Sequence, residues 1–293
     1  MASPQTANTG NLGSIQRTVI SQMRYTEEHN MPVVNLIEKF TLRKGEKQID
    51  IPKADQMSAS DLVDGIDMTD SEDISATVVT ATTAEVGLKV IITDKLARQF
   101  NQDVFGVVGR QMGDAMARKK DTDAIALFPS LNSGTEFGED NKDLSYANAS
   151  ASIAKAKANK FGGPLFVVHH PNAIYTLSKD TAQIGTTGAQ LPDAFAQAQV
   201  KNFYTGIRIN QVPFFEDGNI ESKSGATNGG VGVIANKRAL GHVSSQARRV
   251  ERQRDASLRA VEMVITEDYG MFEVDDTLGA PLLYKINDVA TNA

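Results

Sequence analysis

The clearest pattern of hydrophobic and polar positions begins at Val86. Hydrophobic residues occupy every second position from Val86 to Ile92, which is typical of a strand with one buried face. Thr93 and Asp94 then supply a helix cap and an acidic first turn. From there to Phe128 the hydrophobic residues lie three or four positions apart, and no proline interrupts them. The pattern predicts a strand followed by one helix of roughly 50 Å, at about 1.5 Å per residue, that acts as a structural spine and carries no recognisable active site.

Two short strands are predicted before this region. Hydrophobic residues alternate with polar ones at 40–42 and 49–51, on either side of the turn-forming pair Lys44-Gly45. Pro52 follows, and it either ends the second strand or marks it as the edge of a sheet.

The segment before the spine is strongly acidic, with eight acidic residues and no basic one at positions 54–88. Runs of like charge usually face water, so a solvated loop is one interpretation. The other is a projecting hairpin that lies on a basic surface of a neighbouring molecule, because the threonine-rich stretch 76–84 favours a returning strand. The spacing of the aspartates does not match the alternating ligands of an EF-hand loop, so no calcium site is predicted. The candidate contact residues are Asp61, Asp64, Asp67 and Asp70.

The rest of the chain predicts a mixture of helices and strands, so the expected fold class is α+β. Fully hydrophobic runs indicate buried strands, and a proline that follows such a run is placed to open a helix. The predicted elements are helices at 147–159 and from Pro171, and strands at 165–168, 207–213, 231–234 and within 243–286.

Composition narrows the classes of function. The chain has 293 residues and a net charge of −6, so its overall electrostatics do not favour a nucleic-acid partner. The absence of cysteine excludes disulfides, thiolate metal sites and cysteine nucleophiles. The N-terminus lacks the basic start and apolar core of a secretory signal, and no apolar run approaches the ~20 residues of a membrane helix.

Two adjacent histidines are the strongest candidates for chemistry. His169 and His170 follow a predicted buried strand, where catalytic or metal-binding groups often lie. Adjacent strand residues point to opposite faces, so the two rings are poorly placed to share one metal. A cap on the following helix is the favoured interpretation, and a cytosolic α/β enzyme that uses either histidine is the alternative. No HExxH, GxSxG or Walker motif is present, and we predict no catalytic residue, no metal site and no cofactor.

The best candidate for a nucleic-acid surface is a basic cluster. It consists of Arg248, Arg249, Arg252, Arg254 and Arg259. Specific nucleic-acid binding is disfavoured because no aromatic residue is interleaved for base stacking and nearby acidic residues weaken the positive field. A contact between subunits is favoured, for instance with the acidic segment of a neighbouring copy, and the first four arginines are the candidate contact residues. On this hypothesis, reversing Arg248 and Arg249 to Glu blocks assembly and leaves the monomer folded.

Four phrases of the sequence resemble a known family. They are DGIDMTDSEDI, VIITDKLARQF, FVVHHPNAIYTLSKD and DYGMFEVDDTLGAPLLYK, within a layout of arm, acidic loop and long helix. From about Val33 to Ile286 the chain resembles the major capsid proteins of tailed bacteriophages, whose Hong Kong phage capsid fold is also used by encapsulin shells. The resemblance implies an N-terminal arm at 1–32, an extended hairpin loop with flanking strands at 33–92, a peripheral domain with the spine helix at 93–160, an axial α/β domain at 161–240, and return strands of the peripheral domain at 241–293.

The function that this resemblance implies is mechanical. Many copies would self-assemble as hexamers and pentamers into an icosahedral shell that encloses double-stranded DNA, first in the host cytoplasm and finally in the virion. The implied partners are other copies of this chain, a portal protein, a cement protein where the shell uses one, and packaged DNA in non-specific contact, with no membrane. An encapsulin-type compartment is an alternative, as is another phage structural protein such as a tail component.

Two features depart from parts of the family. Some members begin with a large fused scaffolding segment, whereas fold-like sequence begins here within about 35 residues of Met1, so a separate scaffolding protein is expected. Other members crosslink a loop lysine to a neighbour's asparagine, but positions 54–88 contain no lysine. We therefore expect shell strength to come from interlocking arms and buried area.

Overall fold

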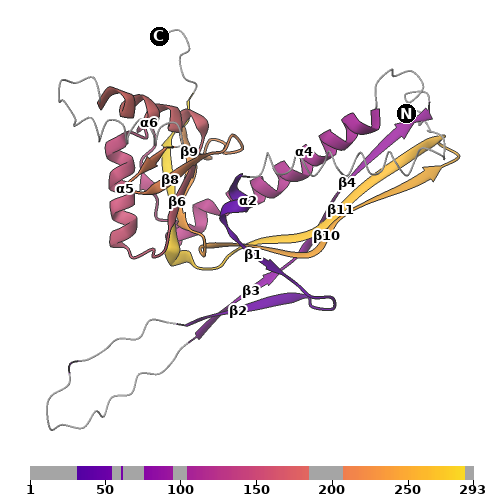
Figure 1. Ribbon diagram of the computed structural model, residues 1–293, viewed down its shortest axis with the longest axis horizontal. Helices are drawn as coiled ribbons and strands as arrows, with labels where there is room; N and C mark the ends of the chain where they lie inside the picture. Colours follow the sequence, from indigo (N-terminus) through magenta and orange to yellow (C-terminus); the bar gives the residue numbers. More distant parts are fainter. Residues whose placement is uncertain (1–31, 55–60, 62–75, 95–103, 185–206, 288–293) are drawn as a thin grey trace.

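The computed structural model describes residues 32–54, 61, 76–94, 104–184 and 207–287 (Figure 1). This part of the chain forms a four-stranded sheet, a six-stranded sheet and a separate two-stranded hairpin. In chain order the elements are α2 (Pro32–Leu36), β1 (Glu38–Thr41), β2 (Gln48–Ala54), β3 (Ala76–Thr82), β4 (Ala84–Thr93), α4 (Val104–Ile125), η2 (Phe128–Gly134), β5 (Phe137–Gly138), α5 (Tyr146–Ala158), β6 (Leu165–His169), α6 (Pro171–Ile184), β7 (Arg208–Ile209), β8 (Val212–Glu216), β9 (Gly229–Asn236), β10 (Leu240–Asp255), β11 (Ala260–Glu273), η3 (Asp276–Leu278) and β12 (Gly279–Lys285).

The four-stranded sheet has the order β1-β10-β11-β4, and α4 packs on one of its faces (Figure 1). Strand β11 pairs antiparallel with β10 and β4, whereas the short β1 runs parallel to the start of β10. Met112 and Met116 of α4 pack in one core with Ile92 and Ile265 of the sheet. The alternation predicted from Val86 to Ile92 is confirmed, because these hydrophobic residues join that core while the intervening residues are exposed.

The six-stranded sheet has the order β5-β12-β9-β6-β8-β7, and both of its faces are covered. Ile153 of α5 and Leu177 of α6 belong to the core on one side. Val33 of α2 packs on the other side with Phe128 and Leu131 of η2. Strands β6 and β9 are buried at every position, which agrees with a sheet that has no solvent-facing side.

Strands β2 and β3 form a hairpin that projects away from both sheets (Figure 1). At its root, Ile49 and Ala81 pack in an apolar cluster with Leu42 and Val243. Pro52 lies inside β2 and marks an edge strand, which is one of the two predicted alternatives. The predicted returning strand is therefore confirmed and pairs with β2 as a hairpin. The acidic residues at 55–60 and 62–75 lie outside the described residues, and the contact with a neighbour stays a prediction.

The spine helix differs from the prediction at its C-terminal end. Asp94 is helical as predicted, and residues 95–103 lie outside the described part. Helix α4 ends at Ile125 and does not continue to Phe128. The reason is Pro129, which has no N–H group to extend the hydrogen bonds of the helix, so the chain passes into the 3-10 turns of η2.

The predicted strand at 207–213 is instead a hairpin of β7 and β8. Asn210 and Gln211 adopt φ angles of 49° and 70° between the two strands. Two-residue hairpin turns of this kind require a positive φ at both positions, and asparagine tolerates it well.

The last strand belongs to a different sheet from the one that the sequence suggests. Strand β12 pairs with β5 and β9, and so lies in the six-stranded sheet and not among the return strands of the four-stranded one. Strand β5 and helix α5 also join the six-stranded sheet and its core. The predicted divisions after 160 and 240 therefore do not follow the sheets. The reason is burial: β12 is buried at its first six positions and needs a sheet that is covered on both faces.

Candidate assembly surfaces

A buried ionic network joins α4 to the four-stranded sheet. Glu267 of β11 accepts a hydrogen bond from the Lys120 ammonium through Oε1, and another from Arg248 Nη2 through Oε2 at 3.1 Å. The side chains of Lys120, Glu267 and Arg248 are 5%, 7% and 16% exposed. Two cations thus share one carboxylate away from water, and removing any of the three leaves a buried charge poorly compensated. Arg248, predicted as a contact residue, is held inside its own subunit.

A second polar layer lies beside this network. The Tyr269 hydroxyl donates to Asp123 Oδ2 at 2.9 Å, and Lys119 Nζ pairs with Asp123 Oδ1 at 2.5 Å. Burial raises the pKa of Tyr269, and the hydrogen bond to Asp123 raises it further, so the hydroxyl remains a donor. The His242 ring stacks on Tyr269 with centroids 5.9 Å apart. These hydrogen bonds and ion pairs are directional, so they fix the position of α4 along the sheet. Apolar packing alone would leave that position less well determined.

The other predicted arginines do not form one patch. Arg249 faces away from α4, whereas Arg252 and Arg254 lie on the α4 side, because neighbouring strand residues point to opposite faces. Arg249 is 63% exposed and pairs with the exposed Glu251 at 2.7 Å. Burial lowers the pKa of Arg252, while Arg254 is exposed. The exposed members of the cluster are therefore Arg249, Arg254 and Arg259.

Only one of the predicted acidic contact residues is described. Asp61 is exposed. Asp64, Asp67 and Asp70 lie outside the described residues. Their pairing with arginines of a neighbouring copy stays a prediction.

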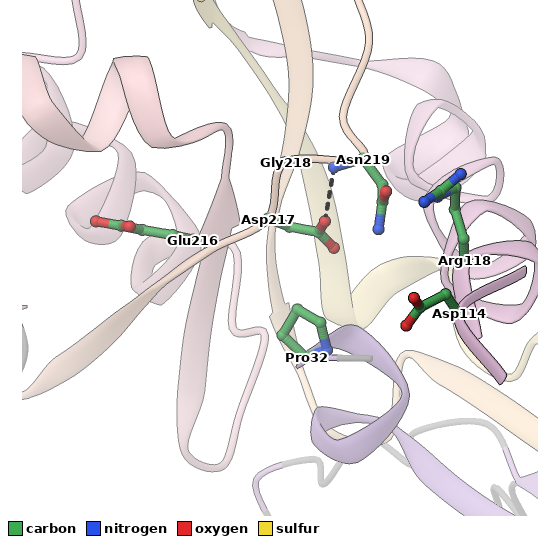
Figure 2. A pocket seen from close by; sticks show the side chains of 7 residues that line it. All are labelled: Pro32, Asp114, Arg118, Glu216, Asp217, Gly218 and Asn219. Atoms are coloured by element: carbon green, nitrogen blue, oxygen red, sulfur yellow. Dashed lines mark hydrogen bonds between the residues drawn. The ribbon is translucent and has the colours of Figure 1, made fainter. Parts of the chain in front are cut away.

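A polar pocket of about 290 Å³ opens where α2, α4 and the loop after β8 meet (Figure 2). Figure 2 shows Asp217 and Asn219 on one wall and Asp114 and Arg118 of α4 on the other, with Pro32 beside them. The Asn219 N–H donates to Asp217 Oδ1 at 2.9 Å. Because this pocket has several charged groups and little apolar lining, it is a junction between three elements and does not resemble a typical small-molecule site.

Asp121 of α4 connects the same three elements and is fully buried. The Val33 N–H donates to its Oδ1 at 3.3 Å, and Asn219 Nδ2 donates to its Oδ2 at 3.0 Å. Burial raises the pKa of Asp121 to about 8, and the neighbouring Asp217 carboxylate raises it as well. Most molecules therefore hold a proton here at neutral pH. The proton lets Asp121 donate to Asp217, whose buried Oδ2 has no other hydrogen-bond partner among the described residues.

The two histidines have separate structural roles. His170 caps α6, as the favoured interpretation predicts: its Nδ1 accepts the Asn172 N–H at 3.2 Å, and its carbonyl accepts the Ala173 N–H at 3.0 Å. His169 is fully buried, and its Nδ1 accepts the His170 N–H at 2.9 Å. Burial lowers the pKa of His169 to about 4, so its ring is neutral at pH 7.

Within the described residues, no three histidine, aspartate or glutamate side chains gather closely enough to hold a metal ion. No described helix is long and apolar enough to cross a membrane.

Sequence reasoning does not identify Lys120, Glu267 or Asp121, although a signal for the first two is present. Lys120 follows Met116 at the helical spacing of four, and Glu267 follows Ile265 at the strand spacing of two. Each charge thus continues an apolar stripe, and opposite charges that continue two facing stripes indicate a buried pair.

Comparison with known proteins agrees with this architecture. A family model described as phage capsid protein matches residues 76–283. The capsid of cyanophage P-SCSP1u is similar, with 16% identity and a TM-score of 0.61 over 86% of this chain and 87% of that chain. The head of Helicobacter pylori bacteriophage KHP40 gives 10% identity and a TM-score of 0.63 over 86% and 87%. An encapsulin complex, SrpI from Synechococcus elongatus, gives 10% identity and a TM-score of 0.62 over 89% and 90%. No curated protein matches the sequence.

The solved structures show the fold, and the family model shows the relationship. The matched residues include the returning strand of the hairpin, the spine helix α4 and both sheets. Because the match extends over well over half of the sequence, the chain belongs to the phage capsid protein family and has the α+β capsid fold.

Proposed function

We propose that this chain is the major structural subunit of an icosahedral phage capsid, in which hexamers and pentamers of the chain enclose double-stranded DNA. Its role is mechanical and not catalytic. The observation that carries the proposal is the match of the phage capsid family model to residues 76–283. The same residues form a body of two sheets and the returning strand of a projecting hairpin.

The hairpin supports assembly because an isolated two-stranded hairpin is at best marginally stable in water. Only its root is well buried here: Ala81 is 1% exposed, whereas Val78 further out is 55% exposed. On the outward side, Thr80 Oγ1 donates to Asp50 Oδ1 at 2.7 Å across the two strands. A second copy of the chain supplies the surface that would cover this outer part.

The acidic segment extends the same contact. Asp61 and the three aspartates after it lie in the segment that follows β2, and Arg249 and Arg254 are the exposed basic residues of β10. Both side chains of the Arg249–Glu251 pair are exposed to water, so the ion pair contributes little stability. An acidic residue of a neighbour can therefore replace Glu251 at little cost.

Other partners follow from the capsid role. A separate scaffolding protein directs closure, a portal protein occupies one vertex, and a cement protein reinforces the shell where one is used. Assembly takes place in the host cytoplasm, and the mature location is the virion. The net charge of −6 suits a wall that meets packaged DNA without binding it tightly.

The test is electron microscopy of the purified chain, alone and with its scaffolding protein, together with the nucleic-acid content of the particles. Closed shells of uniform size that fill with DNA support a phage capsid. Closed shells that hold protein cargo and no DNA favour the second candidate, an encapsulin-type compartment, which the similarity to the SrpI structure suggests. A chain that remains monomeric or dimeric under all conditions contradicts both.

A further inference from the structure

The hairpin contacts its own subunit at its root and again further out. At the root, Ile49 of β2 and Ala81 of β3 pack in the apolar cluster on β10. The second contact lies further out on the same side of the hairpin, since Lys53 is four residues beyond Ile49 and alternate residues share a face. There Lys53 Nζ meets Asp275 Oδ1 at 2.5 Å, with side chains 35% and 16% exposed.

Asp275 belongs to an acidic corner, which we define as Glu273 at the end of β11 together with Asp275 and Asp276, which follow it before β12. Each carboxylate of the corner is held by its own subunit. Asp275 Oδ1 accepts from the Thr277 N–H at 3.0 Å, Ser133 Oγ donates to Asp276 Oδ2 at 2.9 Å, and Ser130 Oγ donates to Glu273 Oε2 at 3.0 Å. The corner is therefore in place independently of the hairpin, and Lys53 brings a positive charge to it.

The electrostatics agree with this geometry. Although burial opposes the effect, the Lys53 ammonium and the Thr277 hydroxyl together lower the pKa of Asp275. The carboxylate is thus ionised at neutral pH and attracts Lys53. Because both groups remain partly exposed to water, added salt weakens this attraction.

The root acts as the pivot. At Gly270 of β11 the backbone of β3 passes so closely that a Cβ atom would lie 2.2 Å from the Thr82 carbonyl oxygen. Lys53 lies about 13 Å along the strand from Ile49, at about 3.3 Å per residue. An ion pair at that distance restrains rotation about the root far more than a contact at the root itself.

We propose that the Lys53–Asp275 ion pair is a strut that sets the angle at which the hairpin leaves the subunit body. With the pair formed, the hairpin is held against the acidic corner. With the pair broken, the apolar root remains as a restraint, and the hairpin samples a wider range of angles. Because the strut lies within one chain, this inference does not depend on whether the chain builds a capsid.

The test measures the hairpin angle through a distance between two spin labels. The chain has no cysteine, so Val78→Cys on the hairpin and Tyr175→Cys on α6 give two unique labels at exposed positions. Pulsed electron paramagnetic resonance is recorded on full-length labelled chain diluted with an excess of unlabelled chain, which removes distances between subunits whether or not shells form. The measurement is made at low and high salt.

Two variants separate the strut from a general loss of charge. Lys53→Met keeps the length of the side chain and removes its charge. Lys89→Met is the matched control, because it removes the 2.7 Å ion pair with Glu262 on the four-stranded sheet and leaves the hairpin untouched.

In the labelled chain without a further substitution (the unsubstituted background), we expect a narrow distance distribution at low salt. Lys53→Met should at least double the width of that distribution. High salt should broaden the distribution of the unsubstituted background by a similar amount. Lys89→Met should match the unsubstituted background. A distribution that is equally narrow in Lys53→Met, or that is already broad at low salt without any substitution, overturns the proposal.

Discussion

Arg248 and Arg249 are neighbours in the sequence, yet the structure gives them opposite sensitivities to charge reversal. Arg248→Glu places a second carboxylate next to Glu267 in a site that is almost closed to water. Of the two cations that pair with Glu267 in the described residues, Lys120 alone then remains. Arg249→Glu places a carboxylate on the exposed face, beside Glu251. The second variant is therefore an internal control for the first.

The magnitudes follow from the burial of each pair. Breaking a buried ion pair costs about 3–5 kcal/mol. Arg248 retains some exposure, so we expect the lower value of about 3 kcal/mol, which lowers the melting temperature by roughly 6–12 °C in a chain of this size. An exposed pair contributes about 0–1 kcal/mol, so Arg249→Glu should lower the melting temperature by no more than about 4 °C.

The assay is thermal unfolding of dispersed subunits, followed by circular dichroism, and assembly measured separately by sedimentation. Arg249→Glu is expected to fold normally and to impair assembly. Arg248→Glu is expected to lower the stability of the subunit itself, so any loss of assembly in that variant follows from the loss of stability. The sequence alone leads to the expectation that both reversals leave the monomer folded, whereas the buried position of Arg248 predicts a loss of stability for that variant. Equal melting temperatures for the two variants would refute the assignment of Arg248 to a buried network.

Three further predictions concern the junctions of the fold. Asp121 keeps its proton to about pH 8 when the chain is folded but loses it near pH 4 when it is unfolded, so the native state binds one more proton and its stability falls as pH rises between these values. Asp121→Asn should flatten this fall in the free energy of unfolding, measured by denaturant titrations from pH 4 to 8. An unchanged dependence of the free energy of unfolding on pH would contradict the buried proton. Gly270→Ala should displace β3 and cost about 1–3 kcal/mol, seen as faster amide exchange in β2 and β3 than in β9; unchanged exchange would show that the root tolerates a Cβ. His170→Ala should cost about 1 kcal/mol through the lost cap on α6, measured by chemical unfolding, and a larger loss of assembly than of stability would point to a second role.

The sequence predicts the elements of this fold better than their partners. The alternation from Val86 to Ile92 identifies β4 because a strand beside one helix alternates strictly between buried and exposed. The hydrophobic run of β12 identifies a buried strand but not its neighbours, because any sheet that is covered on both faces would accept it. Pairing between segments more than 40 residues apart, as in β12 and β9, leaves no local signal.

The candidate contacts were harder to predict because charge alone does not show burial. Arg248 and Arg249 look equivalent in the sequence, and only the facing Glu267 on β11 separates them. His170 was predictable as a cap because it precedes Pro171, which is favoured in the first turn of a helix. Asp121 gave no signal, since its burial depends on α2 and on the loop after β8, both remote in sequence.

The central claim is that copies of this chain form a closed shell in which the β2–β3 hairpin of one copy lies on the next. Cryo-electron microscopy of the assembled particles tests it most directly. The account predicts closed icosahedral particles in which the outer face of the hairpin, around Val78, is covered by a second copy. Particles that close without any contact between the hairpin and a neighbouring copy, or a chain that forms no particles at all, would contradict it.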